Sequence, residues 1–197
     1  MKKICVFVLA LSLLLGLCAC GGEGTTETST GTDTAAAGGL RIVCTIFPIY
    51  DWVKNILGSD ENVTMLLDSG VDLHSYQPTA DDIITIAGCD LFIFVGGASD
   101  GWVSGVLESS GSGCRTLNLM EALSGRIREE EQVEGMQAEE EEHGDGTEYD
   151  EHIWLSVRNA AAACDAICAD LGNLDPENAS VYNARTAEYK AKLACMM

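Results

Sequence analysis

Asp90-Leu91-Phe92-Ile93-Phe94-Val95-Gly96-Gly97 is the stretch that decides the fold. Its five central residues form an unbroken apolar run, and a run of this length that ends at glycines predicts a strand buried on both faces. Similar apolar runs predict further strands at residues 41–47, 63–67 and 116–119. Strands without a polar face need helices on both sides of the sheet, so this pattern favours a layered fold.

The segments between these strands have apolar residues at helical spacing. Ile49, Trp52, Val53 and Ile56 recur at that spacing and stop at Gly58, as is typical of a helix end. Further helices are expected at residues 80–87, at 102–107, after residue 156, and from residue 175 onward. The alternation predicts an α/β fold, a three-layer lobe in which helices cover both faces of a parallel sheet.

Two of these helices carry more detailed expectations. The helix that follows Thr79 is expected to bury Ile83, Ile84 and Ala87 on one face. The last helix is expected to begin with Asp175 as its cap and a proline in its first turn. Because its pattern still indicates helix where the sequence stops, we expect the chain to be cut off inside that helix.

His74 lies in a loop, Asp72–Asp82, that follows the predicted strand at 63–67. The loop ends at a helix start, where Thr79 can cap and Asp82 stands three residues on, as in a capping box. In open α/β sheets, ligands bind in loops at the carboxyl ends of strands. His74 is therefore a candidate binding residue.

His152 repeats this arrangement in the stretch Tyr149–Ser156, shortly before another predicted helix start. Two loop histidines at one edge of a sheet predict a metal site. Neutral imidazole is a good ligand for zinc, which prefers four tetrahedral nitrogen, oxygen or sulfur donors. His74 and His152 would supply two nitrogens and leave two positions open.

The first residues have the layout of a secretory signal. Lys2 and Lys3 supply positive charge, and the apolar run that follows is too short to span a bilayer comfortably. The run closes with Leu17-Cys18-Ala19-Cys20, which resembles the lipobox of bacterial lipoproteins and implies cleavage after residue 19 with acyl chains on Cys20. Ordinary secretion is the alternative. Residues 20–39 lack large apolar side chains and are expected to act as a flexible tether.

The overall charge and the cysteines limit the classes of partner and site. The formal net charge of −20 excludes nucleic acid as an expected partner, because its recognition needs a basic surface. Of the nine cysteines, most of those beyond the first segment lie in apolar patterns, where cysteine behaves as a small buried hydrophobe. None forms a CxxC pair, so a thiolate zinc site is not expected, and the spacing assigns no disulfide.

An acidic loop is expected at residues 129–151, which contain many carboxylates and no Lys or Arg. Its composition favours a solvated, disordered run of charge. The alternative is a metal-capture segment, for which Glu142, His143 and Asp145 are the candidates.

Several motifs together resemble the zinc/manganese-binding lipoproteins of ABC importers, an extracytoplasmic solute-binding family. The matching motifs occur in the expected order: Phe47-Pro48-Ile49-Tyr50, Asp72-x-His74-Ser75-Tyr76-Gln77-Pro78, Asp90-Leu91-Phe92 with Gly96-Gly97, and Asp150-Glu151-His152-Ile153-Trp154-Leu155. The resemblance implies two α/β lobes joined by a long helix, with metal in the cleft between them. Residues 40–174 would then be the first lobe and residues 175–197 the start of the linker helix, with the second lobe and its ligands missing.

The resemblance also implies a function. The protein would capture Zn²⁺, with Mn²⁺ as the alternative, and deliver it to an ABC permease that is powered by a cytoplasmic ATPase. It would be a monomer outside the cytoplasm, lipid-anchored to the bacterial cell membrane. His74 and His152 would be the metal ligands, and Tyr76 and Gln77 would either orient them or only shape the turn.

Two other functions stay open at this stage. One is an extracytoplasmic zinc hydrolase with Glu151 as general base, although the sequence has no HExxH pair or phosphate loop. The other is a metal-dependent surface adhesin, a role that the resemblance also allows.

Overall fold

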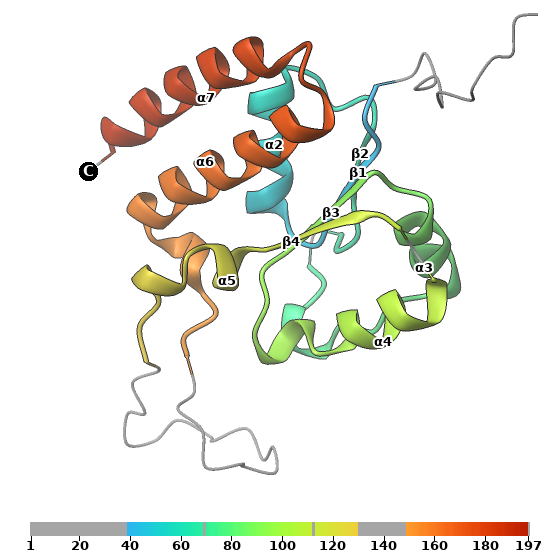
Figure 1. The fold of residues 1–197 in the computed structure, drawn as a ribbon. Coiled ribbons are helices and arrows are strands. Elements are labelled where there is room, and N and C mark those ends of the chain that lie inside the picture. The colour runs from blue at the N-terminus through green and yellow to red at the C-terminus, as the bar shows by residue number, and fades with distance from the viewer. Residues whose placement is uncertain (1–38, 69, 112, 130–148, 197) are drawn as a thin grey trace, which may run out of the picture. The chain divides into compact units, whose positions relative to one another are not determined.

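The computed structural model describes residues 39–68, 70–111, 113–129 and 149–196 (Figure 1). The predicted signal at residues 1–19, the lipidation site Cys20 and nearly all of the tether at 20–39 lie outside the described residues. So do Glu142, His143 and Asp145, with most of the expected acidic loop. Within the described residues, the structure contains no helix with the length and apolar character needed to cross a membrane.

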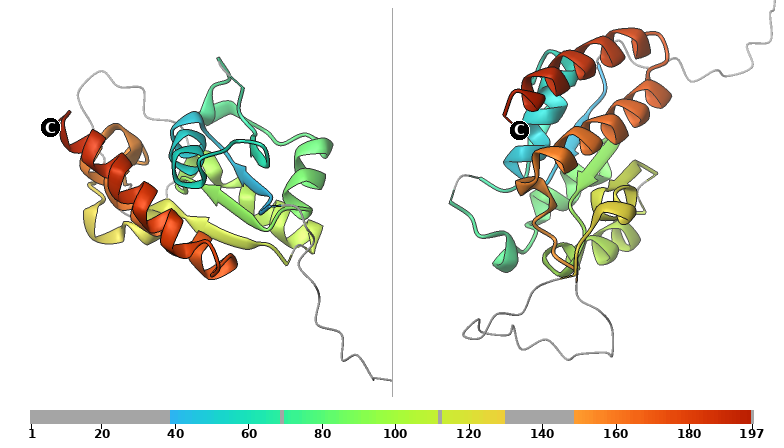
Figure 2. Two further views of the ribbon diagram at one scale, coloured as in Figure 1. Left: turned by 90° about the horizontal axis from the view of Figure 1, so that it is seen from above. Right: turned by 90° about the vertical axis from the view of Figure 1, so that its left-hand side faces the viewer.

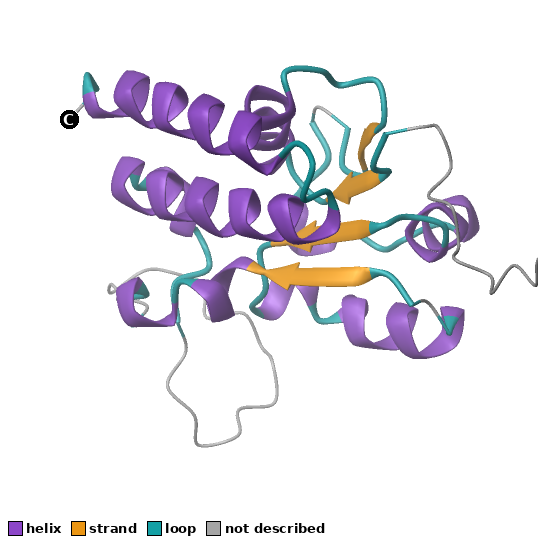
Figure 3. Ribbon diagram, turned by 45° about the horizontal axis from the view of Figure 1, so that its top comes forward, coloured by secondary structure: helices purple, strands orange, loops and turns teal. Residues whose placement is uncertain are grey.

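The sheet has four parallel strands in the order β2-β1-β3-β4. Their bounds are Ile42–Cys44 for β1, Val63–Met65 for β2, Leu91–Phe94 for β3 and Arg115–Asn118 for β4. Val43 pairs with Thr64 on one side and with Phe92 on the other. In Figure 3 the strands are orange arrows that run in the same direction. The predicted parallel sheet is confirmed.

The helices form a layer on each face of this sheet, as Figure 1 shows. Alternate residues of the central strands separate the two layers: Ile93 joins one core and Phe92 the other. The first core packs against α2 (Phe47–Leu57), α6 (Val157–Leu174) and α7 (Ala179–Ala194). The second packs against α3 (Ala80–Ala87) and α4 (Trp102–Ser110). A short helix, α5 (Leu119–Ala122), follows β4.

Two of the predicted strands are shorter or less buried than expected. The strand predicted at 41–47 ends at Cys44, because Phe47 begins α2 with proline in its first turn, where a missing N–H is harmless. The strand predicted at 63–67 as buried is β2, an edge strand with half-buried and exposed residues. Its sequence, Val63-Thr64-Met65, in fact alternates in a way that suits an edge.

Two helix predictions are also wrong in detail. In α3, Ile84 is 68% exposed and Ile86 is fully buried, so the buried face is rotated from the one expected. The last helix begins at Ala179 rather than near Asp175. The Asp175 carboxylate instead accepts hydrogen bonds from Asn178 Nδ2 at 2.8 Å and from the Tyr182 hydroxyl at 2.6 Å, which stabilises a turn between α6 and α7. Figure 2 shows these two helices side by side.

Candidate metal centre

The loop after β2 positions His74 at the carboxyl edge of the sheet. It contains a short 3-10 turn, Leu73–Ser75, which Asp72 begins by accepting a hydrogen bond from the backbone N–H of His74 at 3.2 Å. The loop ends at the predicted capping box of α3. There Asp82 accepts from the Thr79 N–H at 2.8 Å, and Thr79 Oγ1 accepts from the Asp82 N–H at 3.2 Å. Both ends of the loop are therefore fixed by local hydrogen bonds.

His152 lies in the segment that leads into α6, directly before the 3-10 turn Ile153–Leu155. One carboxylate oxygen of Asp150 accepts two hydrogen bonds from this residue, from the backbone N–H at 2.9 Å and from the ring Nδ1 at 3.0 Å. The His152 ring also packs against Trp154, with ring centroids 5.1 Å apart. These contacts fix the orientation of the His152 ring. Because a carboxylate can only accept a hydrogen bond, Nδ1 is the donor in this contact.

The two histidine rings come together, as the sequence predicts. Their centroids are 5.5 Å apart and the planes are tilted by 51°. The side chains are 37% and 39% exposed, so the pair is accessible from solvent. The loops that carry them are far apart in the sequence and meet at the sheet edge where the strands end.

A third segment, the turn between β3 and α4, completes the site. Ser99 in this turn lies between His74 and Glu151: its Oγ is 2.9 Å from His74 Nδ1 and hydrogen-bonds Glu151 Oε1. The Ser99 N–H also donates to Glu151 Oε2 at 3.0 Å. Glu151 Oε1 lies 3.3 Å from His74 Nδ1, and the residue is 8% exposed. A buried carboxylate thus stands behind the ring of His74.

Sequence reasoning missed the contact of Ser99 and Glu151 with His74. The signal that could have indicated it is the glycine pair that ends β3. Gly97 has φ +82°, and a Cβ added to it would stand 2.6 Å from Glu151 Oε2. The chain therefore needs glycine there for the close approach of the carboxylate.

Asp100, in the same turn, is buried beside this carboxylate. Its Oδ2 accepts a hydrogen bond from the Gly96 N–H at 2.9 Å. Burial raises the pKa of Asp100 to about 6; hydrogen bonds from the backbone oppose the shift, and the charge of Glu151 adds to it. The buried Asp100 side chain therefore stabilises the turn between β3 and α4 through this hydrogen bond.

A family model described as zinc-uptake complex component A, periplasmic, matches residues 42–196. This match covers both histidine loops. The chain belongs to that family.

Curated relatives of this zinc-uptake family agree with the assignment. Zinc-binding protein AdcA of Streptococcus pyogenes serotype M3 is 30% identical over 166 residues, which are 80% of this chain and 32% of that protein. The high-affinity zinc uptake system protein ZnuA of Bacillus subtilis is 32% identical over 162 residues, 78% of this chain and 48% of that protein. The chain thus spans 32% to 48% of the length of these relatives.

Solved structures have the same fold. The metal-dependent lipoprotein YcdH of Bacillus subtilis has a TM-score of 0.64 and 29% identity, over 79% of this chain and 52% of that one. FpvC of Pseudomonas aeruginosa, in complex with Mn²⁺, has a TM-score of 0.66 and 29% identity, over 79% of this chain and 54% of that one. These neighbours are also about twice as long as the part they share with this member of the zinc-uptake family.

The other two residues predicted for the site lie in the His74 loop. The Tyr76 hydroxyl donates to Asp82 Oδ2 at 2.9 Å, and the ring packs edge-on against Trp102. These contacts favour the interpretation of Tyr76 as a residue that shapes the turn. Burial is the larger cause that raises the pKa of Tyr76, and the Asp82 hydrogen bond adds to it. Gln77 is exposed in the same loop.

The donor set available to a metal ion consists of the two imidazoles. Among residues 39–68, 70–111, 113–129 and 149–196, no group of three or more His, Cys, Asp or Glu side chains is arranged to hold a metal ion. Cys44 and Cys164 do not add donors, because burial raises the pKa of each to about 12 and keeps both thiols protonated. Both lie in the core, as predicted.

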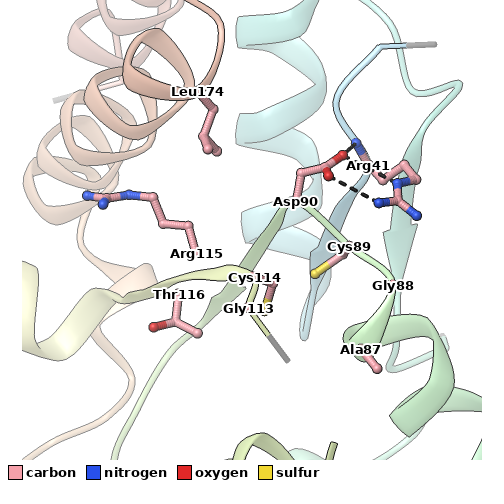
Figure 4. A pocket seen from close by; sticks show the side chains of 10 residues that line it. All are labelled: Arg41, Ala87, Gly88, Cys89, Asp90, Gly113, Cys114, Arg115, Thr116 and Leu174. Carbon is pink, nitrogen blue, oxygen red and sulfur yellow. Dashed lines mark hydrogen bonds and ion pairs between the residues drawn. The ribbon is translucent and has the colours of Figure 1, made fainter. Parts of the chain in front are cut away.

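A hollow of about 620 Å³ lies at the opposite, amino-terminal edge of the sheet. Figure 4 shows its lining, which includes Arg41 and Arg115. Arg41 is paired with Asp90, with Nη2 3.1 Å from Oδ1, and Arg115 is paired with Asp170. Because carboxylates neutralise both guanidinium groups, this hollow lacks the charge of an anion site and is separate from the histidine pair.

Proposed function

We propose that this chain captures a divalent transition metal outside the cytoplasm, with His74 and His152 as ligands. The observation that carries the proposal is the pair of accessible imidazoles, 5.5 Å apart between centroids. Each ring has its Nδ1 in a hydrogen bond, which leaves the other nitrogen, Nε2, for a metal ion. Histidines that bind metal commonly have such a partner on the second ring nitrogen.

Zinc is the metal that the donors favour. Imidazole nitrogen suits Zn²⁺, and the curated relatives are named as zinc-binding or zinc-uptake proteins. Mn²⁺ is the alternative, because a neighbour of the same fold is in complex with that ion. Zinc takes four donors, so two imidazoles leave two positions for water or for groups outside the described residues.

The proposed role in the importer follows from the family. Residues 40–174 would act as the first lobe, and the segment 175–197, in which the helix begins at Ala179, would lead to a second lobe that supplies the remaining ligands. The protein would be a monomer, anchored through acyl chains on Cys20 to the bacterial membrane. It would deliver zinc to an ABC permease and its ATPase, which is consistent with the family's description as a component of a zinc-uptake complex.

The acidic segment would assist capture. Glu142, His143 and Asp145 would collect zinc weakly near the membrane and raise its local concentration at the imidazole pair. A single imidazole among carboxylates binds zinc less tightly than two fixed imidazoles, so this segment would exchange its metal quickly.

We propose binding without bond chemistry. The hydrolase alternative needs Glu151 as a general base with access to a metal-bound water. Glu151 is instead buried, and both its carboxylate oxygens accept hydrogen bonds from Ser99. A carboxylate held in this way supports a structural role at the site rather than proton abstraction.

The experiment is a zinc titration of the purified protein against a chromophoric chelator. We expect one zinc per chain, and we expect His74→Ala and His152→Ala each to weaken its binding at least tenfold. His143→Ala is the matched control, because it removes the third histidine and should leave this zinc unchanged. If neither of the first two variants weakens binding while the control does, the acidic segment is the site and the proposal fails.

A further inference from the structure

The hydrogen bonds around Ser99 determine which nitrogen of His74 carries the proton. Ser99 has one hydroxyl hydrogen, and an ionised carboxylate can only accept. The hydroxyl therefore donates to Glu151 Oε1, and its oxygen is left as an acceptor toward His74 Nδ1, 2.9 Å away. His74 Nδ1 must then be the donor. Its second acceptor in reach is Glu151 Oε1 itself, at 3.3 Å.

We propose that Ser99 and Glu151 are positioning residues that hold His74 in the Nδ1–H tautomer, so that the lone pair of Nε2 faces the metal. This inference rests on the proposed role of His74 as a ligand. It adds two residues that do not bind metal themselves but decide whether one ligand presents a donor nitrogen. A neutral imidazole in the other tautomer carries a hydrogen on Nε2 and cannot ligate there.

The two histidines obtain the same tautomer by different means. Asp150 binds the Nδ1 of its near neighbour His152 directly and is 47% exposed at its side chain. Glu151 acts on His74 from a distant part of the sequence and is only 10% exposed at its side chain. A hydrogen bond shielded from water is stronger than an exposed one, so the arrangement around His74 should be the more rigid.

The position of Glu151 also ties three segments together. Its backbone belongs to the segment before α6, its carboxylate binds the turn after β3 through Ser99, and that turn contacts the loop after β2 through His74. Gly97 admits the carboxylate to this place. The buried negative charge also favours a dication at the adjacent imidazoles over a neutral ligand.

The test is the tautomer of His74 in the metal-free protein, measured by two-bond ¹H–¹⁵N NMR at about pH 8, where ordinary imidazoles are neutral. Wild type is expected to show Nδ1–H. Glu151→Gln replaces an acceptor by an amide that can donate to Ser99, so the serine hydroxyl can turn toward Nδ1. We expect His74 to change to Nε2–H, and zinc affinity to fall by roughly 10- to 100-fold.

Two further variants separate positioning from loss of fold. Ser99→Ala leaves the direct 3.3 Å contact with Glu151 and should weaken zinc less than Glu151→Gln does. Glu108→Gln removes an exposed carboxylate from α4 and should change neither the tautomer nor the affinity. An unchanged His74 tautomer in Glu151→Gln would overturn the inference. Tight zinc binding by His74→Ala would instead overturn the proposed function, whatever the tautomer.

Discussion

Gly97 is a position where the site requires glycine. Its φ of +82° and ψ of −165° lie in a region that is essentially restricted to glycine. A methyl group there would also overlap Glu151 Oε2, at 2.6 Å from the new Cβ. Both the backbone and the neighbouring carboxylate therefore require a residue without a side chain.

We expect Gly97→Ala to lower the free energy of unfolding by about 2–4 kcal/mol, from backbone strain together with displacement of Glu151. Gly111→Ala is the matched control, since Gly111 also has positive φ but has nothing within 4 Å of an added Cβ. Its cost should be about 1 kcal/mol, from the backbone alone. Urea unfolding compares the two, and equal losses would show that contact with Glu151 is unimportant.

The sequence predicted the site residues whose side chains are themselves metal-ligating groups in a motif. His74 and His152 were expected to meet because both lie in loops at the carboxyl ends of strands, and their rings are in contact distance. Ser99 was not expected, although it stands in the glycine-flanked stretch Gly97-Ala98-Ser99-Asp100-Gly101 between β3 and α4. Its contact with Glu151 depends on the path of the turn after β3, and that path is fixed only by tertiary packing.

Among the elements, α3 is the one whose capping box was predicted. Thr79 and Asp82 form the expected capping box, and the Thr79 hydroxyl also donates to Asp82 Oδ2 at 2.7 Å. Burial alone would raise the pKa of Asp82, but hydrogen bonds from Thr79 and Tyr76 outweigh it and lower the pKa. The cap fixes the end of the loop that carries His74.

Thr79→Ala is expected to cost about 1 kcal/mol of stability, because the Asp82 N–H loses its acceptor. Thr85→Ala is the control in the same helix. Its hydroxyl only donates to the Asp81 carbonyl, and alanine has the higher helix propensity, so stability should not fall. Thermal unfolding of both variants measures the difference, and a larger loss for Thr85→Ala would contradict the capping argument.

Element boundaries were less predictable than element types. Asp175 has the residue type of a helix cap, and a proline follows it, yet the helix begins at Ala179. The sequence pattern does not reveal that Asp175 accepts a hydrogen bond from Tyr182. This hydrogen bond stabilises a turn of three residues before the helix begins. The strand predicted at 41–47 is too long for a similar reason. The apolar residues Ile46 and Phe47 belong to the start of α2 and not to the sheet.

At the scale of the whole described lobe, the parallel sheet follows from the apolar strands. The run Leu91–Phe94 is buried throughout, and helices pack on both its faces. Because all strands point the same way, their following loops gather at one edge, and this brings residues 74, 99 and 151 together. The strand order and the depth at which Glu151 is buried came only from the structure.

The most direct test of the account is to count the imidazoles around zinc by X-ray absorption spectroscopy of the loaded protein. The account predicts two imidazole ligands in the wild type and one in each of His74→Ala and His152→Ala, with His143→Ala unchanged. The same imidazole count in wild type, His74→Ala and His152→Ala would mean that the metal is held elsewhere, and would contradict the central claim that these two histidines bind one ion together.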